Sequence, residues 1–136
     1  MKKIIVLLSI VVIIIVIVAF NYMDYKREYN SIQKYNLEFN KYYQKEIYGT
    51  DLTTVINKVI NNNEKNNVEK DKNKKYIDNN LDSIDIDIKM IDIDEIYEME
   101  TLYNGGIEKF VQYYSNIKFK CTQIEYHKKT GKVKYL

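Results

Sequence analysis

The sequence predicts an α+β protein, in which an N-terminal transmembrane helix continues into a long amphipathic helix, followed by shorter helices and a small antiparallel sheet of three or four strands. Three observations lead to this prediction. Residues 4–20 are almost uniformly apolar, and apolar residues between 22 and 60 recur at helical spacing. Residues 84–90 and 117–121 alternate between apolar and polar, as half-buried strands do.

The membrane anchor is predicted by the run from Ile4 to Phe20, which only Ser9 interrupts. Leu, Ile, Val and Phe each favour the centre of a bilayer by roughly 0.3–0.6 kcal/mol, so the run favours insertion. At about 1.5 Å per residue it extends roughly 25 Å, close to a hydrocarbon core of about 30 Å. We therefore expect an anchor at residues 1–20 and one small α+β domain at residues 21–136.

A cleaved signal peptide is the alternative to an uncleaved anchor. Signal peptidase requires small residues one and three positions before the cut. Ala19 is the small candidate near the end of the run, but Ile17 stands two residues before it. The sequence therefore favours an uncleaved anchor.

Positive charges on the two sides of the run bear on orientation. Lys2 and Lys3 precede the run, and Lys26, Arg27 and Lys34 follow it, so the two counts nearly balance. A short charged leader directly before the apolar run resembles a signal-anchor. We expect a cytoplasmic N-terminus and an extracytoplasmic C-terminal domain.

A helix-packing face is predicted beyond the anchor, because residues 21–48 contain no Gly or Pro. Its candidate members recur at helical spacing: Tyr22, Tyr25, Tyr29, Ile32, Phe39 and Tyr43. Such a face is buried by the protein's own domain, by another copy or by a partner helix, and the first is the simplest expectation. Asn36 falls where a heptad requires an apolar residue, which argues against a coiled coil.

A second helix is expected to begin at Thr50 or Asp51 as N-cap, after Gly49 ends the first. Its amphipathic stripe consists of Leu52, Val55, Ile56, Val59 and Ile60. Residues 61–75 are almost all Asn, Lys, Glu and Asp, and bury too little apolar surface to offset the entropy of ordering. We expect an exposed polar loop or a weak hairpin there.

Alternation then predicts a strand with one buried face, made of Ile84, Ile86, Ile88 and Met90. The phase changes next, because Ile91 and Ile93 belong to the opposite face. A bulge or the end of the strand would explain that change.

Two short helices are expected after this strand. Asp94 can cap the first, which runs to about Tyr103, and Gly105-Gly106 breaks it. Apolar residues at helical spacing predict the second over residues 107–114.

A hairpin closes the predicted fold. Residues 117–121 alternate, and Ile124 and Tyr126 continue in the other phase. Residues 128–131 form a turn that places a glycine where a positive φ is required, and residues 133–136 return as the partner strand.

Charge and composition restrict the class of function. The formal net charge of +2 equals the charge of Lys2 and Lys3, so the predicted domain is neutral and lacks the basic surface of a nucleic-acid-binding protein. The 14 tyrosines would suit a sugar or wall polymer. We favour the interpretation that the tyrosines reflect an AT-rich genome, because Asn, Lys, Ile and Tyr all have AT-rich codons.

Candidates for catalysis are few. His127 is the only histidine and Cys121 the only cysteine, and six positions along one strand separate them by roughly 20 Å. We expect His127 to be a solvated turn residue and Cys121 a small buried core residue. Without a phosphate loop, nucleophile elbow or paired-histidine motif, we expect no catalytic residues and no enzyme.

An acidic run is the candidate for a metal site. Asp82, Asp85, Asp87, Asp92 and Asp94 carry oxygen ligands of the kind that calcium binds. Asp85 and Asp87, however, alternate with isoleucines as on the exposed face of a strand. We therefore expect no metal and no cofactor.

The layout resembles that of type IV pilin-like subunits, which have an apolar N-terminal helix, an amphipathic continuation and a small antiparallel sheet. A prepilin has a Gly at the processing site, then a Phe and, four residues on, a Glu. Here the first glycine is Gly49, and residues 4–20 contain no acidic residue. The resemblance implies a subunit of an envelope assembly without the prepilin signal.

Three stretches resemble small, uncharacterised membrane-anchored proteins of AT-rich Gram-positive bacteria of the clostridial type. They are residues 47–63, Met99–Asn104 and Phe119–Gly131. The resemblance implies a membrane-anchored architecture and carries over no site residues.

We expect, from these observations, a non-enzymatic single-pass membrane protein that serves as a structural or accessory subunit of an envelope assembly. Its partners would be the lipid bilayer and either itself or another membrane or envelope protein, with no nucleic acid. The alternative is a membrane-anchored binding or sensing module for a wall polymer, an ion or a neighbouring protein. That module would use the tyrosine-rich surface and the polar segment 61–75.

Overall fold

The computed structural model describes residues 1–91 and 94–136. These residues form a mixed α+β structure with four helices and six short strands, which confirms the predicted fold class. The chain divides into two compact units, Met1–Lys34 and Tyr35–Leu136.

The first helix, α1 (Lys2–Asn40), contains the apolar run. An 18-residue window of this helix has a mean hydropathy of 3.4, and none of the window is buried inside the protein. Among the described residues, α1 is the one helix long and apolar enough to cross a membrane. Length and composition therefore support the predicted anchor.

α1 ends at Asn40, so the prediction of a helix through Tyr48 is wrong. Gln44 has a positive φ of 59°, which a continuing helix does not allow. The chain then forms β1 (Glu46–Tyr48), which pairs antiparallel with β4 (Lys118–Lys120). Pairing with a strand so distant in sequence overrides the local helical pattern.

The second helix, α2 (Gly49–Lys65), carries the predicted stripe. All five of its members are buried: Leu52, Val55, Ile56, Val59 and Ile60. Gly49 starts this helix, and a Cβ there would lie 2.0 Å from the carbonyl oxygen of Tyr114. Thr50 and Asp51 lie inside the first turn and are not the N-cap.

Residues 61–75 are more ordered than predicted, because α2 continues through the first five of them. Asn63 is fully buried there. Its side chain accepts a hydrogen bond from the N–H of Ile84 at 2.9 Å and donates to the C=O of Ile84 at 2.7 Å. The rest of the segment closes through an antiparallel bridge between Lys70 and Tyr76, in agreement with the hairpin alternative.

The strands β2 (Asp87–Met90) and β3 (Glu95–Glu98) form an antiparallel hairpin. The predicted buried face is confirmed at Ile84, Ile86 and Ile88.

Of the two explanations for the phase change, a bulge or the end of the strand, the structure shows the second, since β2 stops at Met90 and the side chain of Ile91 is 86% exposed. Ile93 and Asp92, which belong to the predicted phase change and acidic run, lie outside the described residues. Asp94 caps no helix but occupies the turn with a φ of 50°, because the chain returns as β3.

Two helices follow β3 with the break where the sequence predicts it. α3 (Met99–Asn104) ends at Gly105, and α4 (Ile107–Tyr114) begins after Gly106. Gly106 has a φ of 95°, a conformation that favours glycine.

The C-terminal hairpin consists of β5 (Glu125–Tyr126) and β6 (Val133–Tyr135). Gly131 in its turn has a φ of 70°, as predicted. The described strands form three two-stranded antiparallel sheets, β1-β4, β2-β3 and β5-β6, instead of one sheet of three or four strands. β6 also runs parallel to the segment before β2 through a bridge between Tyr135 and Asp85.

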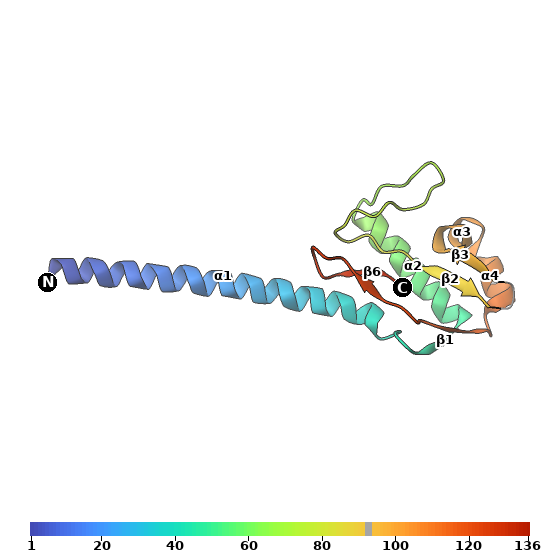
Figure 1. Ribbon diagram of the computed structural model, residues 1–136, viewed down its shortest axis with the longest axis horizontal. Helices are drawn as coiled ribbons and strands as arrows, with labels where there is room; N and C mark the ends of the chain where they lie inside the picture. Colours follow the sequence, from blue (N-terminus) through green and yellow to red (C-terminus); the bar gives the residue numbers. More distant parts are fainter. Residues whose placement is uncertain (92–93) are drawn as a thin grey trace. The chain divides into compact units, whose positions relative to one another are not determined.

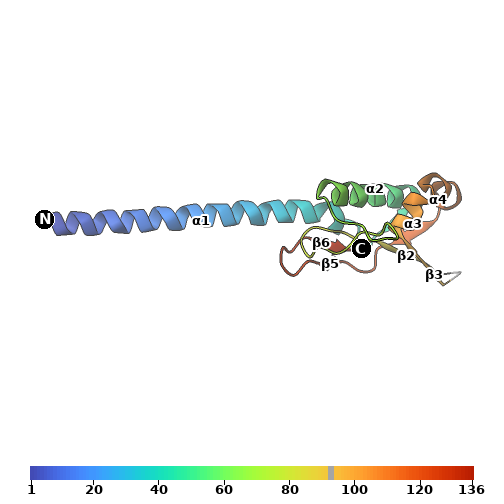
Figure 2. The same ribbon diagram turned by 90° about the horizontal axis from the view of Figure 1, so that it is seen from above.

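The core of unit Tyr35–Leu136 lies between α2 and the strands. Figures 1 and 2 show α2 on one side of β2 and β6. The central buried side chains come from α2, from the segment before β2, from the start of α3 and from β6: Ile56, Val59, Ile60, Ile84, Met99 and Val133. Apolar burial of this kind stabilises the domain by about 25 cal/mol per Å².

Candidate functional site

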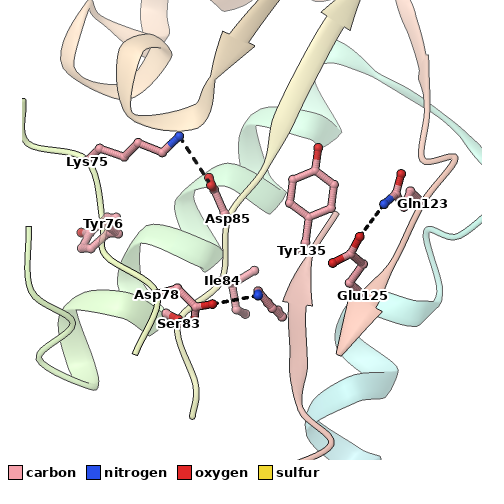
Figure 3. Close-up of a pocket in the computed structure, with 10 residues that line it drawn as sticks. Lys75, Tyr76, Asp78, Ser83, Ile84, Asp85, Gln123, Glu125 and Tyr135 are labelled. Carbon is pink, nitrogen blue, oxygen red and sulfur yellow. Dashed lines mark hydrogen bonds and ion pairs between the residues drawn. The ribbon is translucent and has the colours of Figure 1, made fainter. Parts of the chain in front are cut away.

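A pocket of about 510 Å³ opens beside β6 (Figure 3). Charged and aromatic side chains line it, among them Lys75, Tyr76, Asp78, Asp85, Lys134 and Tyr135. Its volume falls within the range of clefts that bind small ligands. Several of these residues come from segments that the sequence predicts to be polar loop or strand face.

Asn79 holds the turn that positions two residues of the pocket lining, Asp78 and Ser83. Its Oδ1 accepts hydrogen bonds from the three N–H groups of residues 81–83, each at 3.0 Å. Asn80 next to it has a φ of 58°, which asparagine tolerates better than most residues. The resulting tight turn brings Ser83 back to Asp78, and the Ser83 hydroxyl donates to Asp78 Oδ1 at 3.1 Å.

Two lysines in the pocket are held by carboxylates. Lys75 Nζ lies 2.7 Å from Glu98 Oε1 and 3.8 Å from Asp85 Oδ2. The hydrogen bond with Glu98 raises the pKa of Lys75, so its ammonium group stays charged. Lys134 Nζ lies 2.8 Å from Asp78 Oδ2. The lining carries two lysines and three carboxylates, Asp78, Asp85 and Glu125, so its formal charge does not favour an anion.

The two aspartates of the pocket differ in proton affinity. Burial raises the pKa of Asp85, and the negative charge of Glu100 adds to that effect. Burial acts in the same direction at Asp78, but hydrogen bonds from Lys134, the Asn80 N–H and Ser83 outweigh it and lower the pKa of Asp78.

Tyr135 closes the pocket beside β6. Burial raises its pKa to about 12, and the charge of Asp87 adds to this. Its hydroxyl therefore stays protonated at neutral pH and donates to Asp87 Oδ2 at 3.1 Å.

His127 is buried, so the prediction of a solvated turn histidine is wrong. Only 3% of the residue is exposed. Its Nε2 lies 2.7 Å from the Ser83 carbonyl oxygen, and its Nδ1 lies 3.7 Å from Asp78 Oδ1. The ring thus joins the C-terminal turn to residues 78–83, a contact between distant segments that local turn chemistry does not reveal.

Ser83, His127 and Asp78 meet without the geometry of an activated serine. In a catalytic triad, an imidazole nitrogen accepts the proton of the serine hydroxyl. Here His127 Nε2 faces the carbonyl oxygen of Ser83, which only accepts, so this nitrogen carries the hydrogen. The hydroxyl of Ser83 donates instead to Asp78. The arrangement ties the C-terminal turn to residues 78–83 and leaves no imidazole nitrogen as the acceptor of the hydroxyl hydrogen.

Cys121 is partly exposed, which corrects the prediction of a buried core residue. Its thiol donates to the carbonyl oxygen of Gln123 at 3.3 Å. Burial of the remaining surface raises the pKa of Cys121, so the reactive thiolate is disfavoured.

The acidic run contributes to hydrogen bonding. Asp82 accepts from the Asn79 side chain at 2.8 Å, Asp85 from the Ile86 N–H at 2.9 Å, and Asp87 from Tyr135. Within residues 1–91 and 94–136, no three His, Cys, Asp or Glu side chains lie close enough together to hold a metal ion.

The predicted helix-packing face divides into members with different surroundings. The exposed fractions of Tyr22, Tyr25 and Tyr29 are 62%, 67% and 52%, and Ile32 is half-buried. Phe39 is buried in the core of unit Tyr35–Leu136, whereas Tyr43 lies beyond α1 and is 49% exposed. Phe39 is therefore the member of this face that packs against the protein's own domain.

Comparison of the chain with family models, with curated proteins and with solved structures found no match. The candidate sites consequently depend on geometry and chemistry alone.

Sequence patterns missed two features of this domain. One is the structural use of buried asparagines, for which a polar residue inside an apolar stripe, such as Asn36 or Asn63, is the available signal. The other is an apolar groove between β2 and β4, whose walls come from distant parts of the chain. A groove of that kind cannot be predicted from a local sequence pattern.

Proposed function

We propose that this chain is a non-enzymatic single-pass membrane protein that presents unit Tyr35–Leu136 outside the cell membrane. It acts through protein contacts as a structural or accessory subunit of an envelope assembly with a pilin-like layout. The observation that supports this proposal is α1, an apolar helix that continues into a segment with exposed aromatic side chains.

The aromatic segment is the part of α1 suited to a protein partner. Tyr25 and Tyr29 stack on each other, with their ring centroids 6.5 Å apart, and both are more than half exposed. Tyrosine buries a large area at low entropic cost, which makes it frequent in protein interfaces. A second copy or a partner helix would cover this face.

The test is crosslinking in cells of the full-length protein, with and without the double substitution Tyr29→Asp and Ile32→Asp. We expect the substitutions to abolish crosslinking to partner proteins. Membrane insertion should stay intact, because both positions lie beyond the apolar run. A matched control is Asn30→Asp with Ser31→Asp, which adds the same charge on the opposite face of the helix. Unchanged crosslinking in the first variant would contradict the proposal.

Orientation is tested separately, by labelling an introduced cysteine at an exposed site. Lys72→Cys with Cys121→Ser should react with a membrane-impermeant maleimide in intact cells if the domain is extracytoplasmic. Reaction only after cell lysis would contradict that orientation.

The pocket in Figure 3 favours a second candidate function, a binding or sensing module for a wall polymer, an ion or a neighbouring protein. Titration of the full chain in micelles with soluble peptidoglycan fragments, and separately with calcium chloride, tests it by chemical-shift changes at Tyr76 and Tyr135. Shifts at these tyrosines that Asp78→Asn removes would support this function, and their absence would exclude these two ligands.

A further inference from the structure

An apolar groove of about 870 Å³ runs between β2 and β4. Leu52 and Val55 of α2 contribute to its lining, and Ile88 and Phe119 contribute from the two strands. In Figure 1, α2 lies behind β2. The groove is thus a gap between two strands that has an apolar helix face beneath it.

The edge of β4 that faces away from β1 carries main-chain groups at alternate residues. Gly49 N–H donates to Ile117 C=O at 3.0 Å, and β1 pairs with β4 in antiparallel register. Since hydrogen-bonded pairs alternate in such a ladder, the main-chain N–H and C=O of Phe119 point towards β1. The N–H and C=O groups of Lys118 and Lys120 therefore point away from β1.

The edge of β2 that faces away from β3 also carries main-chain groups at alternate residues. Met99 N–H donates to Ile86 C=O at 3.1 Å, which fixes the phase of the β2-β3 ladder. The main-chain groups of Asp87 and Lys89 accordingly point away from β3. Asp87 N–H already donates to Leu136 C=O at 3.4 Å, so Leu136 occupies this edge at Asp87 and Lys89 is the next residue along it.

The line of β6 leads into the groove. Asp85 N–H donates to Lys134 C=O at 2.9 Å, and Leu136 N–H donates to Asp85 C=O at 3.1 Å, the slanted pattern of a parallel pair. A strand placed in line with β6 would meet Lys89 next, parallel to β2.

The side chains around the groove define the sequence of such a strand. Ile88 is buried and Phe119 packs on Phe110 with ring centroids 5.8 Å apart, so these side chains face the core. Lys89, Lys118 and Lys120 alternate with them and are exposed. Lys89 and Lys118 have carboxylate neighbours, Asp94 and Glu46, but exposed pairs of this kind are weak and exchange readily.

We propose that this groove binds an extended segment of another protein as an added β-strand, with acidic residues facing the three lysines and apolar residues facing α2. Main-chain hydrogen bonds to both edges would provide affinity, and the alternating side chains would provide specificity. The inference goes beyond the proposed function, because it depends on unit Tyr35–Leu136 and not on membrane insertion.

The test uses the full chain in detergent micelles and a blocked, fluorescent hexapeptide of alternating glutamate and valine. We expect saturable binding by fluorescence anisotropy, weakened by salt, with slower hydrogen exchange at the amides of Lys89, Lys118 and Lys120. A peptide with lysine in place of glutamate should bind at least about tenfold more weakly. Equal binding of both peptides, or binding without protection of the three amides, would overturn the proposal.

A matched pair of variants isolates the main-chain contribution. Lys120→Ala and Lys120→Pro both remove the charge, but only proline removes the N–H that points into the groove. We expect the proline variant to bind about tenfold more weakly than the alanine variant, and equal affinities would count against strand addition. If Lys120→Pro fails to fold, a peptide N-methylated at the residues facing β4 makes the same comparison with the unchanged protein.

Sedimentation and hydrogen exchange of the full chain without peptide test whether a second copy of the chain fills the groove. Whether or not copies associate through α1, the three amides are expected to exchange freely without peptide. A dimer with the same three amides protected would show that a second copy fills the groove, which would overturn the assignment to another protein.

Discussion

Buried asparagine side chains replace main-chain partners at two points of this domain. Asn36 donates to the C=O of Gly131 at 2.8 Å and accepts from the N–H of Val133 at 2.9 Å. Asn63 makes the same pair of bonds with Ile84. The primary amide offers a donor and an acceptor side by side, so it can satisfy a strand edge that faces a helix. Asparagine-rich composition is therefore not only a consequence of codon usage here.

Asn63→Ala is predicted to lower the free energy of unfolding by about 2–4 kcal/mol, because two buried main-chain groups lose their partners. Urea denaturation of the full chain in micelles, followed by near-ultraviolet circular dichroism, measures the effect. Asn61→Ala, on the exposed side of the same helix, is the control and should change little. Equal midpoints for the two variants would contradict this role of Asn63.

The opposite pKa changes of Asp85 and Asp78 predict opposite effects of pH. The pKa of Asp85 is raised in the folded protein, so its carboxyl favours folding at pH values below its unfolded pKa, and that contribution is lost as pH rises. The pKa of Asp78 is lowered, so its contribution is present above the unfolded pKa and is lost as pH falls.

Asp85→Asn should therefore unfold at a higher urea concentration than the unchanged chain at pH 7, and the difference should shrink towards pH 3. Asp78→Asn should unfold at a lower concentration at pH 7, with a difference that also shrinks towards pH 3. Measuring both variants against the unchanged chain cancels the titration of other carboxyls. Shifts of the same sign at pH 7 would contradict the assignment.

At the scale of the elements, α2 and the end of α4 approach each other at one glycine. A Cβ on Gly49 would lie 2.0 Å from the oxygen and 2.7 Å from the carbon of the Tyr114 carbonyl, neither of which is a flexible side chain. Gly49→Ala is predicted to cost at least about 2 kcal/mol of unfolding free energy, since the backbone must move. Thr50→Ala, at the next and exposed position, serves as control in the same denaturation experiment. A loss of stability that is no larger at Gly49 would show that the two segments can separate freely.

How far the elements follow from sequence depends on where their partners lie. The stripe of α2 and the alternation of Ile84, Ile86 and Ile88 were predictable, because periodicity reports a buried face directly. The end of α1 was not, because β1 owes its existence to pairing with β4. Asp94 was misplaced for the same reason, since β3 is fixed by β2 and not by a local capping signal.

At the scale of the whole molecule, an N-terminal helix long and apolar enough to cross a membrane was predictable, and the sites were not. Insertion depends on composition summed over one helix, which the sequence shows directly. The pocket around Asp78 and the groove between β2 and β4 bring together residues from several segments. His127 illustrates the limit: its neighbours in sequence are polar turn residues, but Ser83 and Asp78 enclose it in space.

The division between the two units predicts where the chain can be shortened. Unit Tyr35–Leu136 includes the last turn of α1, where Asn36 bonds to the C-terminal hairpin and Phe39 is 3% exposed. A chain that starts at Tyr35 should keep the amide spectrum of the domain. A chain that starts at Lys41 loses the two bonds of Asn36 and the burial of Phe39, a cost of at least about 4 kcal/mol.

That cost is a large share of the 5–15 kcal/mol by which native domains are typically stable. We therefore expect the chain from Lys41 to be partly or wholly unfolded at 25 °C in heteronuclear NMR spectra, whereas the chain from Tyr35 unfolds cooperatively in urea. Equal dispersion and equal midpoints for the two would show that the last turn of α1 is dispensable. The expected result would mean that one helix combines an apolar run long enough to cross a membrane with a final turn that belongs to the domain core.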